Sequence, residues 1–245
     1  MTPNLPEIRR GVVSPMECLK EGWAAIKGQY WLIFGIVFVG VLIGNAVPVF
    51  LWGPMMCGIY LCLLRKLRGQ PLDFAMLFKG FDYFAQSLIP AALQFLPGLV
   101  MFVLYFIVLL VYATTAAPRG YVTQAEASEY FTTMMLMYLG FIIAFIVVAW
   151  GVMIFLLFSY ALIVDRGLSG WDSVKTSANA GLANFPGILA LLLLSLLLMF
   201  AGVLACYVGA FLTWPIALAS WTVAYRRIFG DPPQTDDGLP SAAAA

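Results

Sequence analysis

The stretch Arg166-Gly167-Leu168-Ser169-Gly170-Trp171-Asp172 separates two long apolar runs and decides how the chain is organised. Two similar stretches occur earlier: Arg68-Gly69-Gln70-Pro71-Leu72-Asp73, and Arg10-Gly11 followed by Ser14-Pro15-Met16-Glu17. Each contains Arg-Gly, a capping position, Pro or Gly, an apolar residue and an acid. Each also precedes an amphipathic segment and then apolar sequence long enough to cross a membrane. The chain therefore has a repeated internal plan.

These stretches predict the first turns of three helices. An acid three residues after Ser is typical of a helix start, because the hydroxyl and the carboxylate each satisfy a free backbone N–H group. Ser14 with Glu17, and Ser169 with Asp172, have the cap and the acid, whereas Gln70 is a poor cap followed by Pro at the first helical position. We expect helices over residues 14–29, 70–86 and 169–184.

The three expected helices are amphipathic. Met16, Trp23 and Tyr30 fall on one helical stripe, while Lys20 and Lys27 lie largely off it. Trp and Phe on one side with Lys on the other favour a helix that lies in the headgroup layer of a membrane. Two interpretations stay open: interfacial connectors of the kind that any multi-pass protein needs, or a true threefold repeat with units 14–69, 70–168 and 169–230.

The composition is that of an integral membrane protein. Of the 245 residues, 63% are hydrophobic and 10% are charged, whereas a soluble domain carries roughly 25% charged residues. The mean hydropathy of +0.95 leaves no room for a sizeable soluble domain. The net charge of +1 predicts no nucleic-acid partner, and the absence of His excludes His-based zinc sites and catalysis. The four cysteines are interpreted as apolar packing residues: Cys18, Cys57, Cys62 and Cys206.

The apolar runs predict an all-α integral membrane protein of six transmembrane helices in three hairpins, each preceded by a cytoplasmic-side interfacial helix. The expected spans are two within residues 30–64, broken at 45–48 and 53–54, one over 88–117, one over 130–164, and two within 185–225 that meet near 207–209. Twelve of the 13 Lys and Arg residues then lie on the side of the termini, and only Arg119 lies opposite. The positive-inside rule places both termini in the cytoplasm. We expect a flexible N-terminus over 1–13, one transmembrane domain over 14–230 and a disordered tail over 231–245.

The run over residues 130–164 is too long for one simple span. As a single helix it extends about 52 Å, whereas the hydrocarbon core is about 30 Å thick. We expect either a break near Gly140 or Gly151, or an outer part that leaves the membrane. In the second case the outer ends of spans three and four, residues 108–139, pack on each other or meet a partner. The alternative is a tilted hairpin with a packed core.

A few side chains stand out, and none carries a clear chemistry. Asp165-Arg166 closes the fourth run, and an acid–base pair at a span end is most often a surface contact. Trp171 and Asp172 belong to the repeated stretch. Asn45 and Gln94 are polar residues in or near apolar runs, where hydrogen bonds between helices are the usual role. We assign no residue to catalysis, to a metal or to a cofactor.

Two segments resemble known proteins: WGPMMCGIYLCLLRKLRGQPLDFAMLFKGF (52–81) and SYALIVDRGLSGWDSVKTSANAG (159–181). They are similar to uncharacterised bacterial six-pass membrane proteins grouped only as domains of unknown function. The layout resembles, more distantly, the membrane domain joined to some bacterial glycerophosphodiester phosphodiesterases. The resemblance implies a bacterial inner membrane. The chain lacks the soluble phosphodiesterase domain and its acidic metal ligands, so no catalytic residue is carried over.

The sequence favours a non-enzymatic membrane protein of scaffold type, which organises lipid or a partner protein. The alternative is a small transporter or channel with a path between the three hairpins, and a membrane-embedded enzyme comes third. The expected partners are the lipid bilayer and a membrane or periplasmic protein or a second copy of the chain. No cofactor is expected.

Overall fold

The computed structural model describes residues 6–115, 123–204 and 208–231. It is 87% helical, and no strand occurs in these ranges. Four helical segments are long and apolar enough to cross a membrane, namely Pro15–Ala46, Phe74–Thr115, Gln124–Arg166 and Phe185–Leu204. The all-α prediction is confirmed for the described residues, and these four segments have the length and composition of membrane spans.

The chain divides into two compact units, which we name the bundle (Met1–Ala92 with Ile154–Ala245) and the long hairpin (Leu93–Met153). The bundle contains α1 (Pro15–Ile26), η1 (Lys27–Gln29), α2 (Tyr30–Ala46), α3 (Trp52–Leu67), η2 (Phe74–Tyr83), α6 (Ser159–Arg166), α7 (Gly170–Ala183), α8 (Phe185–Leu204) and α9 (Val208–Phe229). The hairpin is formed by most of α4 (Phe84–Thr115) and α5 (Gln124–Leu156).

The predicted helix starts are confirmed at Ser14 and Ser169, and the predicted side-chain cap forms at Ser169 but not at Ser14. The Ser169 hydroxyl accepts a hydrogen bond from the backbone N–H of Asp172 at 3.2 Å and donates one to its carboxylate at 2.8 Å. At α1 the Ser14 side chain caps no backbone N–H, although Pro15 occupies the first turn as expected. The Glu17 carboxylate accepts a hydrogen bond from Arg227 at 2.8 Å, so a tertiary contact is made at this helix start.

The middle interfacial segment differs from the expected α-helix. Residues 70–73 have no helix, and the segment that follows is the 3-10 helix η2. A Cβ added at Gly80 would collide with the backbone of Pro54 and Gly58, and one at Gly58 would collide with the carbonyl of Leu77. The backbones of η2 and α3 therefore touch directly. We attribute the 3-10 conformation of η2 to this contact with α3. The poor cap at Gln70 provides no α-helix start that would compete with it.

Two of the expected breaks lie elsewhere in the structure. The first hairpin turns at residues 47–51, as predicted, but residues 53–54 lie in the first turn of α3, where Pro is tolerated. The helix α5 continues through Gly140 and Gly151 and ends at Leu156. The break occurs there because the N–H of Phe158 donates to the hydroxyl of Ser177 on α7, at 3.1 Å. A side chain inserted into the helical ladder is a recognised cause of a kink.

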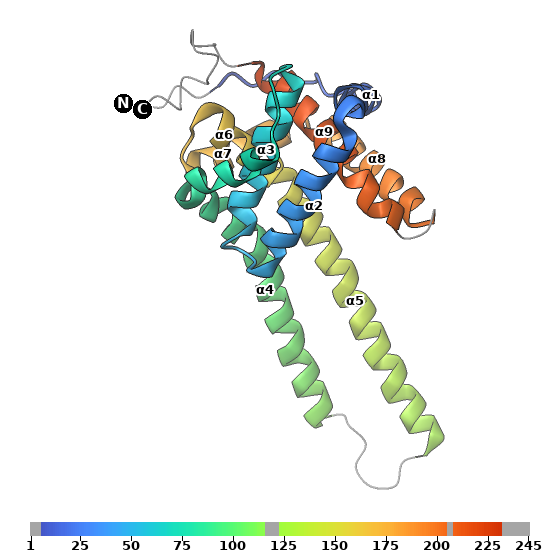
Figure 1. Cartoon of the computed structure of the whole chain (residues 1–245). Helices are drawn as coiled ribbons and strands as arrows, with labels where there is room; N and C mark the ends of the chain where they lie inside the picture. The colour runs from blue at the N-terminus through green and yellow to red at the C-terminus, as the bar shows by residue number, and fades with distance from the viewer. Residues whose placement is uncertain (1–5, 116–122, 205–207, 232–245) are drawn as a thin grey trace. The chain divides into compact units, whose positions relative to one another are not determined.

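Each of the three elements that were predicted to be interfacial packs on the last helix of the segment before it. η2 lies against α3, α7 lies against α6, and α1, at the start of the chain, lies against α9 at its end (Figure 1). Close backbone contact recurs at the α1–α9 crossing, where a Cβ on Gly22 would lie 2.8 Å from the backbone nitrogen of Ser220. Large aromatic side chains fill the centre, and the Tyr60 hydroxyl donates to the carbonyl of Leu157 at 3.2 Å.

The long hairpin has a different construction. None of its described residues is buried. Its two helices contact each other through stacked rings, Tyr105 on Phe141 at 4.3 Å and Tyr112 on Tyr130 at 5.3 Å between centroids. Exposed Leu, Ile, Val, Phe and Met side chains cover both helices around their circumference. A helix that is apolar all round belongs in a protein core or in a membrane.

Candidate functional site

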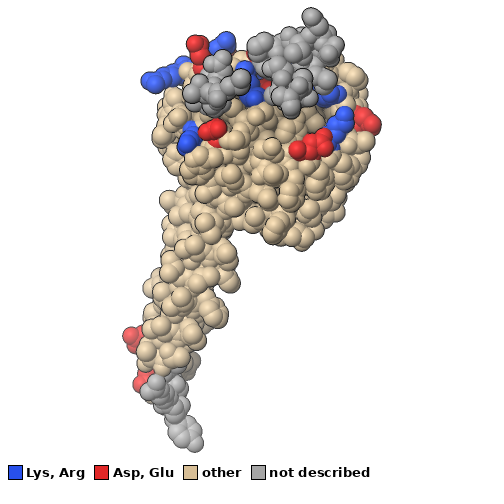
Figure 2. All heavy atoms as spheres, turned by 90° about the vertical axis from the view of Figure 1, so that its left-hand side faces the viewer, with Lys and Arg blue, Asp and Glu red and all other residues tan. Residues whose placement is uncertain are grey.

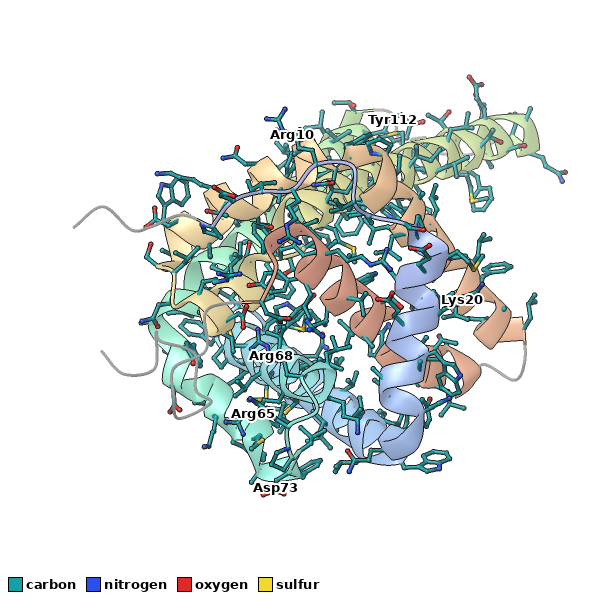
Figure 3. All side chains as sticks on the ribbon, turned by 90° about the horizontal axis from the view of Figure 1, so that it is seen from above. Arg10, Lys20, Arg65, Arg68, Asp73 and Tyr112 are labelled. Atoms are coloured by element: carbon teal, nitrogen blue, oxygen red, sulfur yellow. The ribbon has the colours of Figure 1, made fainter. Side chains whose placement is uncertain are left out.

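Three helices of the bundle end in the same way. Gly69, Gly167 and Gly230, which follow the ends of α3, α6 and α9, have φ of 71°, 60° and 67°. Glycine favours this left-handed conformation, which closes helix C-termini. The Arg-Gly pairs of the repeated stretches at residues 68 and 166 therefore mark the end of the preceding helix. Arg68 lies among these helix ends in the view from above (Figure 3).

Asp165 forms the centre of this end of the bundle. Its side chain has no exposed surface, and one carboxylate oxygen accepts a hydrogen bond from Arg68 at 2.5 Å. The other oxygen accepts from the Tyr225 hydroxyl at 2.8 Å and lies 3.7 Å from Nε of Arg166. A buried carboxylate is stable only with such partners. Helices α3, α6 and α9 are thus joined through one acid.

The arginines of the site also bind the carbonyls at the helix ends. Arg166 donates to the carbonyls of Phe229 and Gly230, both at 2.8 Å. Arg226 donates to the carbonyl of Leu67 at 2.9 Å. The last carbonyls of a helix lack partners within it and carry its partial negative charge. Each arginine therefore satisfies the end of a neighbouring helix.

Asp231 extends the site to the second residue after the end of α9. Its carboxylate accepts hydrogen bonds from Arg226 at 2.6 and 2.9 Å and from Arg68 at 3.2 Å. The hydrogen bond from Arg226 lowers the pKa of Asp231 below its ordinary 3.8, Arg68 adds to this, and partial burial opposes it. We name the connected residues the ionic cluster: Arg68, Asp165, Arg166, Tyr225, Arg226 and Asp231.

A second ionic group joins the two ends of the fold. Arg227 on α9 donates to Glu17 at 2.8 Å and to Glu21 at 2.6 Å, both on α1. The backbone N–H of Arg9 donates to the carbonyl of Ile228 at 3.1 Å. The N-terminal segment, expected to be flexible, is therefore held to α9 at this residue.

A cavity of about 420 Å³ lies beside these groups. Its lining includes Arg9, Glu21, Leu67, Arg226, Arg227 and Asp231. In Figure 2 the charged side chains of the bundle gather toward one end, and the visible sides below them are uncharged. The arrangement suits binding of a small charged group at a boundary between polar and apolar surroundings.

Of the predicted site residues, Asp165 and Arg166 belong to the ionic cluster. The expected surface contact is wrong for Asp165, since Arg68, distant in sequence, covers the carboxylate. Trp171 is 50% exposed, with the Lys175 ammonium 5.6 Å from its ring centroid, and Asp172 serves the helix start.

The two polar residues of the apolar runs differ from each other. Asn45 is exposed and donates to the carbonyl of Val41 in its own helix at 2.8 Å, not to another helix as expected. Gln94 belongs to the long hairpin. Neither residue contributes to the ionic cluster.

Sequence reasoning missed Arg68, Tyr225, Arg226 and Asp231 as members of one site. The available signal applies to Arg68 alone: Arg precedes Gly at residues 68 and 166, and both pairs mark the end of a helix. In the described ranges, no group of three or more Cys, Asp or Glu residues is placed to hold a metal ion. Cys18, Cys57 and Cys62 are buried free thiols, as a packing role requires, whereas Cys206 and Arg119 lie outside the described residues.

Comparison with protein-family models, with curated proteins and with solved structures gives no match for this chain. Function is therefore inferred from the geometry.

Proposed function

We propose that this chain is a six-span protein of a bacterial inner membrane and acts as a non-enzymatic scaffold, organising lipid or a partner protein around the long hairpin. One observation carries the proposal: no described residue of the hairpin is buried, although its surface is apolar on all sides. Apolar surface of this extent marks a site of contact with membrane or protein.

Six spans require α3 and α9 in addition to the four apolar segments. The helix α3 has 16 residues, about 24 Å, which is short for a hydrocarbon core of about 30 Å. Eleven of these residues are buried within the bundle, so α3 needs little contact with lipid. Basic residues end both helices, Arg65 with Lys66 in α3 and Arg226 with Arg227 in α9. By the positive-inside rule this end, and with it both termini, faces the cytoplasm.

The packing order supports a threefold repeat with units 14–69, 70–168 and 169–230. In each unit the interfacial element covers the last helix of the preceding unit, and α1 covers α9. The final helices of the three units share the glycine ending. Repeats in the same orientation are related by an axis along the membrane normal.

The length of the hairpin helices supports a role in contact with other molecules. The helix α4 has 32 residues without a charge, about 48 Å. The helix α5 has no charge from Tyr130 to its end. Tilting absorbs part of the excess over the hydrocarbon thickness. The remaining apolar surface needs a covering of lipid or protein.

Transport remains the alternative outcome of the test. The buried hydroxyls of α8 and α9 have partners close by: Ser195 accepts from the Trp221 indole at 3.1 Å, and Thr222 donates to the carbonyl of Leu218 at 2.8 Å. Such bonds serve helix packing and helix geometry.

The experiment places a photoreactive amino acid at Leu136 of the hairpin, 63% exposed, and at Leu197 of α8, 66% exposed, as matched control. Cells expressing each variant are irradiated, and the adducts are identified by mass spectrometry. The scaffold predicts a discrete protein adduct, or enrichment of one phospholipid class over the bulk, at Leu136 alone. The bulk lipid distribution at both positions, with solute flux in reconstituted vesicles, contradicts the scaffold and supports transport.

A further inference from the structure

Arg9 is held firmly by its backbone. Its N–H donates to the carbonyl of Ile228 at the end of α9, at 3.1 Å. Its carbonyl accepts a hydrogen bond from the side-chain amide of Asn184, just before α8, at 3.0 Å. The position of the residue is therefore fixed by two helices that come later in the chain.

The guanidinium of Arg9 has no such partner. No hydrogen bond or ion pair joins it to any residue in the described ranges, and the residue is exposed. Its Nη2 atom lies 3.4 Å from the position that a Cβ at residue 230 would occupy. Gly230 has a left-handed backbone, a conformation that favours glycine. Arginine offers five N–H donors in a fixed plane. These donors remain available at the wall of the 420 Å³ cavity.

The other charges of the cavity wall balance one another. Glu21 accepts from Arg227 at 2.6 Å, and Asp231 accepts from Arg226 at 2.6 Å. Arg227 also binds Glu17 outside the wall, and the rest of the ionic cluster adds Arg68, Arg166 and Asp165. Five arginines thus face four acids in this region, and Arg9 is the one that binds no acid in the described ranges. Apolar surface from Leu67 and Val223 completes the wall. The cavity accordingly has a positive, hydrogen-bonding side and an apolar side.

We infer that this cavity binds a phosphate group through Arg9, with the phosphodiester of a phospholipid headgroup and free phosphate as its two sources. A phosphodiester carries one negative charge, which would compensate the positive charge of Arg9. Its oxygens match the planar N–H donors of a guanidinium. The charged end of the bundle is the level at which headgroups lie in the proposed orientation (Figure 2). The site lies entirely in the bundle, so it does not depend on what the hairpin binds.

The experiment measures thermal unfolding of the full-length protein in dodecyl maltoside during titration with one of two probes at constant ionic strength. The probes are dihexanoyl-phosphatidylglycerol and sodium phosphate. Arg9→Gln is compared with Arg10→Gln, because Arg10 is adjacent, exposed, absent from the cavity lining and directed outward (Figure 3). We expect saturable stabilisation of the wild type and of Arg10→Gln, and affinity reduced about tenfold in Arg9→Gln, the factor that loss of a charged hydrogen bond gives.

Saturation by phosphatidylglycerol but not by phosphate assigns a lipid headgroup, and saturation by both assigns the phosphate group itself. Arg9→Lys retains the positive charge but lacks the planar set of N–H donors, and we expect it to bind the probe with intermediate affinity. Arg9→Gln should fold, since the guanidinium has no described partner. If it does not, the wild-type and Arg9→Lys titrations decide. The inference is overturned if neither probe stabilises the wild type saturably. It is also overturned if Arg9→Gln binds with the same affinity as the wild type. Where Arg9→Gln does not fold, an affinity of Arg9→Lys equal to that of the wild type overturns it.

Discussion

The bundle and the long hairpin are both built from apolar helices, and they differ in how their polar groups are used. In the bundle the helix ends meet, and Asp165, Arg166 and Arg226 satisfy charges and carbonyls of neighbouring helices. In the hairpin, within the described residues, ring pairs join two helices that bury no side chain. Apolar composition therefore makes helices of both units suited to a membrane, and the polar ends determine which of them pack together.

The largest expected contrast comes from one substitution made in both units. Gly58→Ala places a Cβ against the backbone of η2, and we expect it to destabilise the bundle by about 3 kcal/mol or more. Gly140→Ala in the hairpin meets nothing within 4 Å, and we expect up to about 1 kcal/mol of stabilisation, since Ala is the better helix former. Thermal unfolding in detergent measures both. Equal effects would remove the distinction between the units.

The next effect tests the buried acid of the ionic cluster. Asp165→Asn removes the fully buried one of the two carboxylates that bind Arg68, whose side chain is 12% exposed, and we expect a loss of about 3–5 kcal/mol. The control is Asp172→Asn at the exposed start of α7, with an expected loss below about 1 kcal/mol. Denaturant titration followed by Trp fluorescence reports both. A loss at Asp165 no larger than at Asp172 would mean that the cluster does not hold the bundle together.

A smaller effect is expected from the ring pairs of the hairpin. In a double-mutant cycle, Tyr105→Ala and Phe141→Ala should show a coupling of about 0.5–1.5 kcal/mol, because their rings stack at 4.3 Å. Tyr105→Ala with Phe131→Ala provides the control, since Phe131 is 66% exposed. Proteolysis of the purified protein measures the opening of the hairpin. Coupling in the control alone would show that the stacked pair does not join the helices.

The smallest effect concerns pH at the end of α9. Because the folded state lowers the pKa of Asp231, its carboxylate stabilises the fold above the unfolded pKa of about 3.9, and this contribution is lost as the pH falls through the lowered value. The pair is partly exposed and screened, so less than about 1 kcal/mol is expected. Asp231→Asn should lower stability at neutral pH and flatten the acid dependence. A variant with the same acid dependence as the wild type would exclude this contribution.

The elements predicted well from sequence are those set by neighbouring residues. The break between α2 and α3 follows from a local turn sequence, and the start of α7 follows from Ser169 with Asp172. The features missed depend on distant partners. The break before α6 requires the Ser177 hydroxyl, 19 residues away, and the burial of Asp165 requires Arg68, 97 residues away. No local pattern contains this information.

The contact between α1 and α9 has a consequence for synthesis. Glu17 and Arg227, which join these helices, are separated by 210 residues. At a translation rate of roughly 5–20 residues per second, α1 waits about 10–40 s for its partner to leave the ribosome. During that time the buried stripe of α1, which contains Cys18, Gly22 and Ile26, needs another apolar surface. In the proposed orientation the headgroup layer would provide one, and the amphipathic character of α1 would then protect the nascent chain until α9 is made.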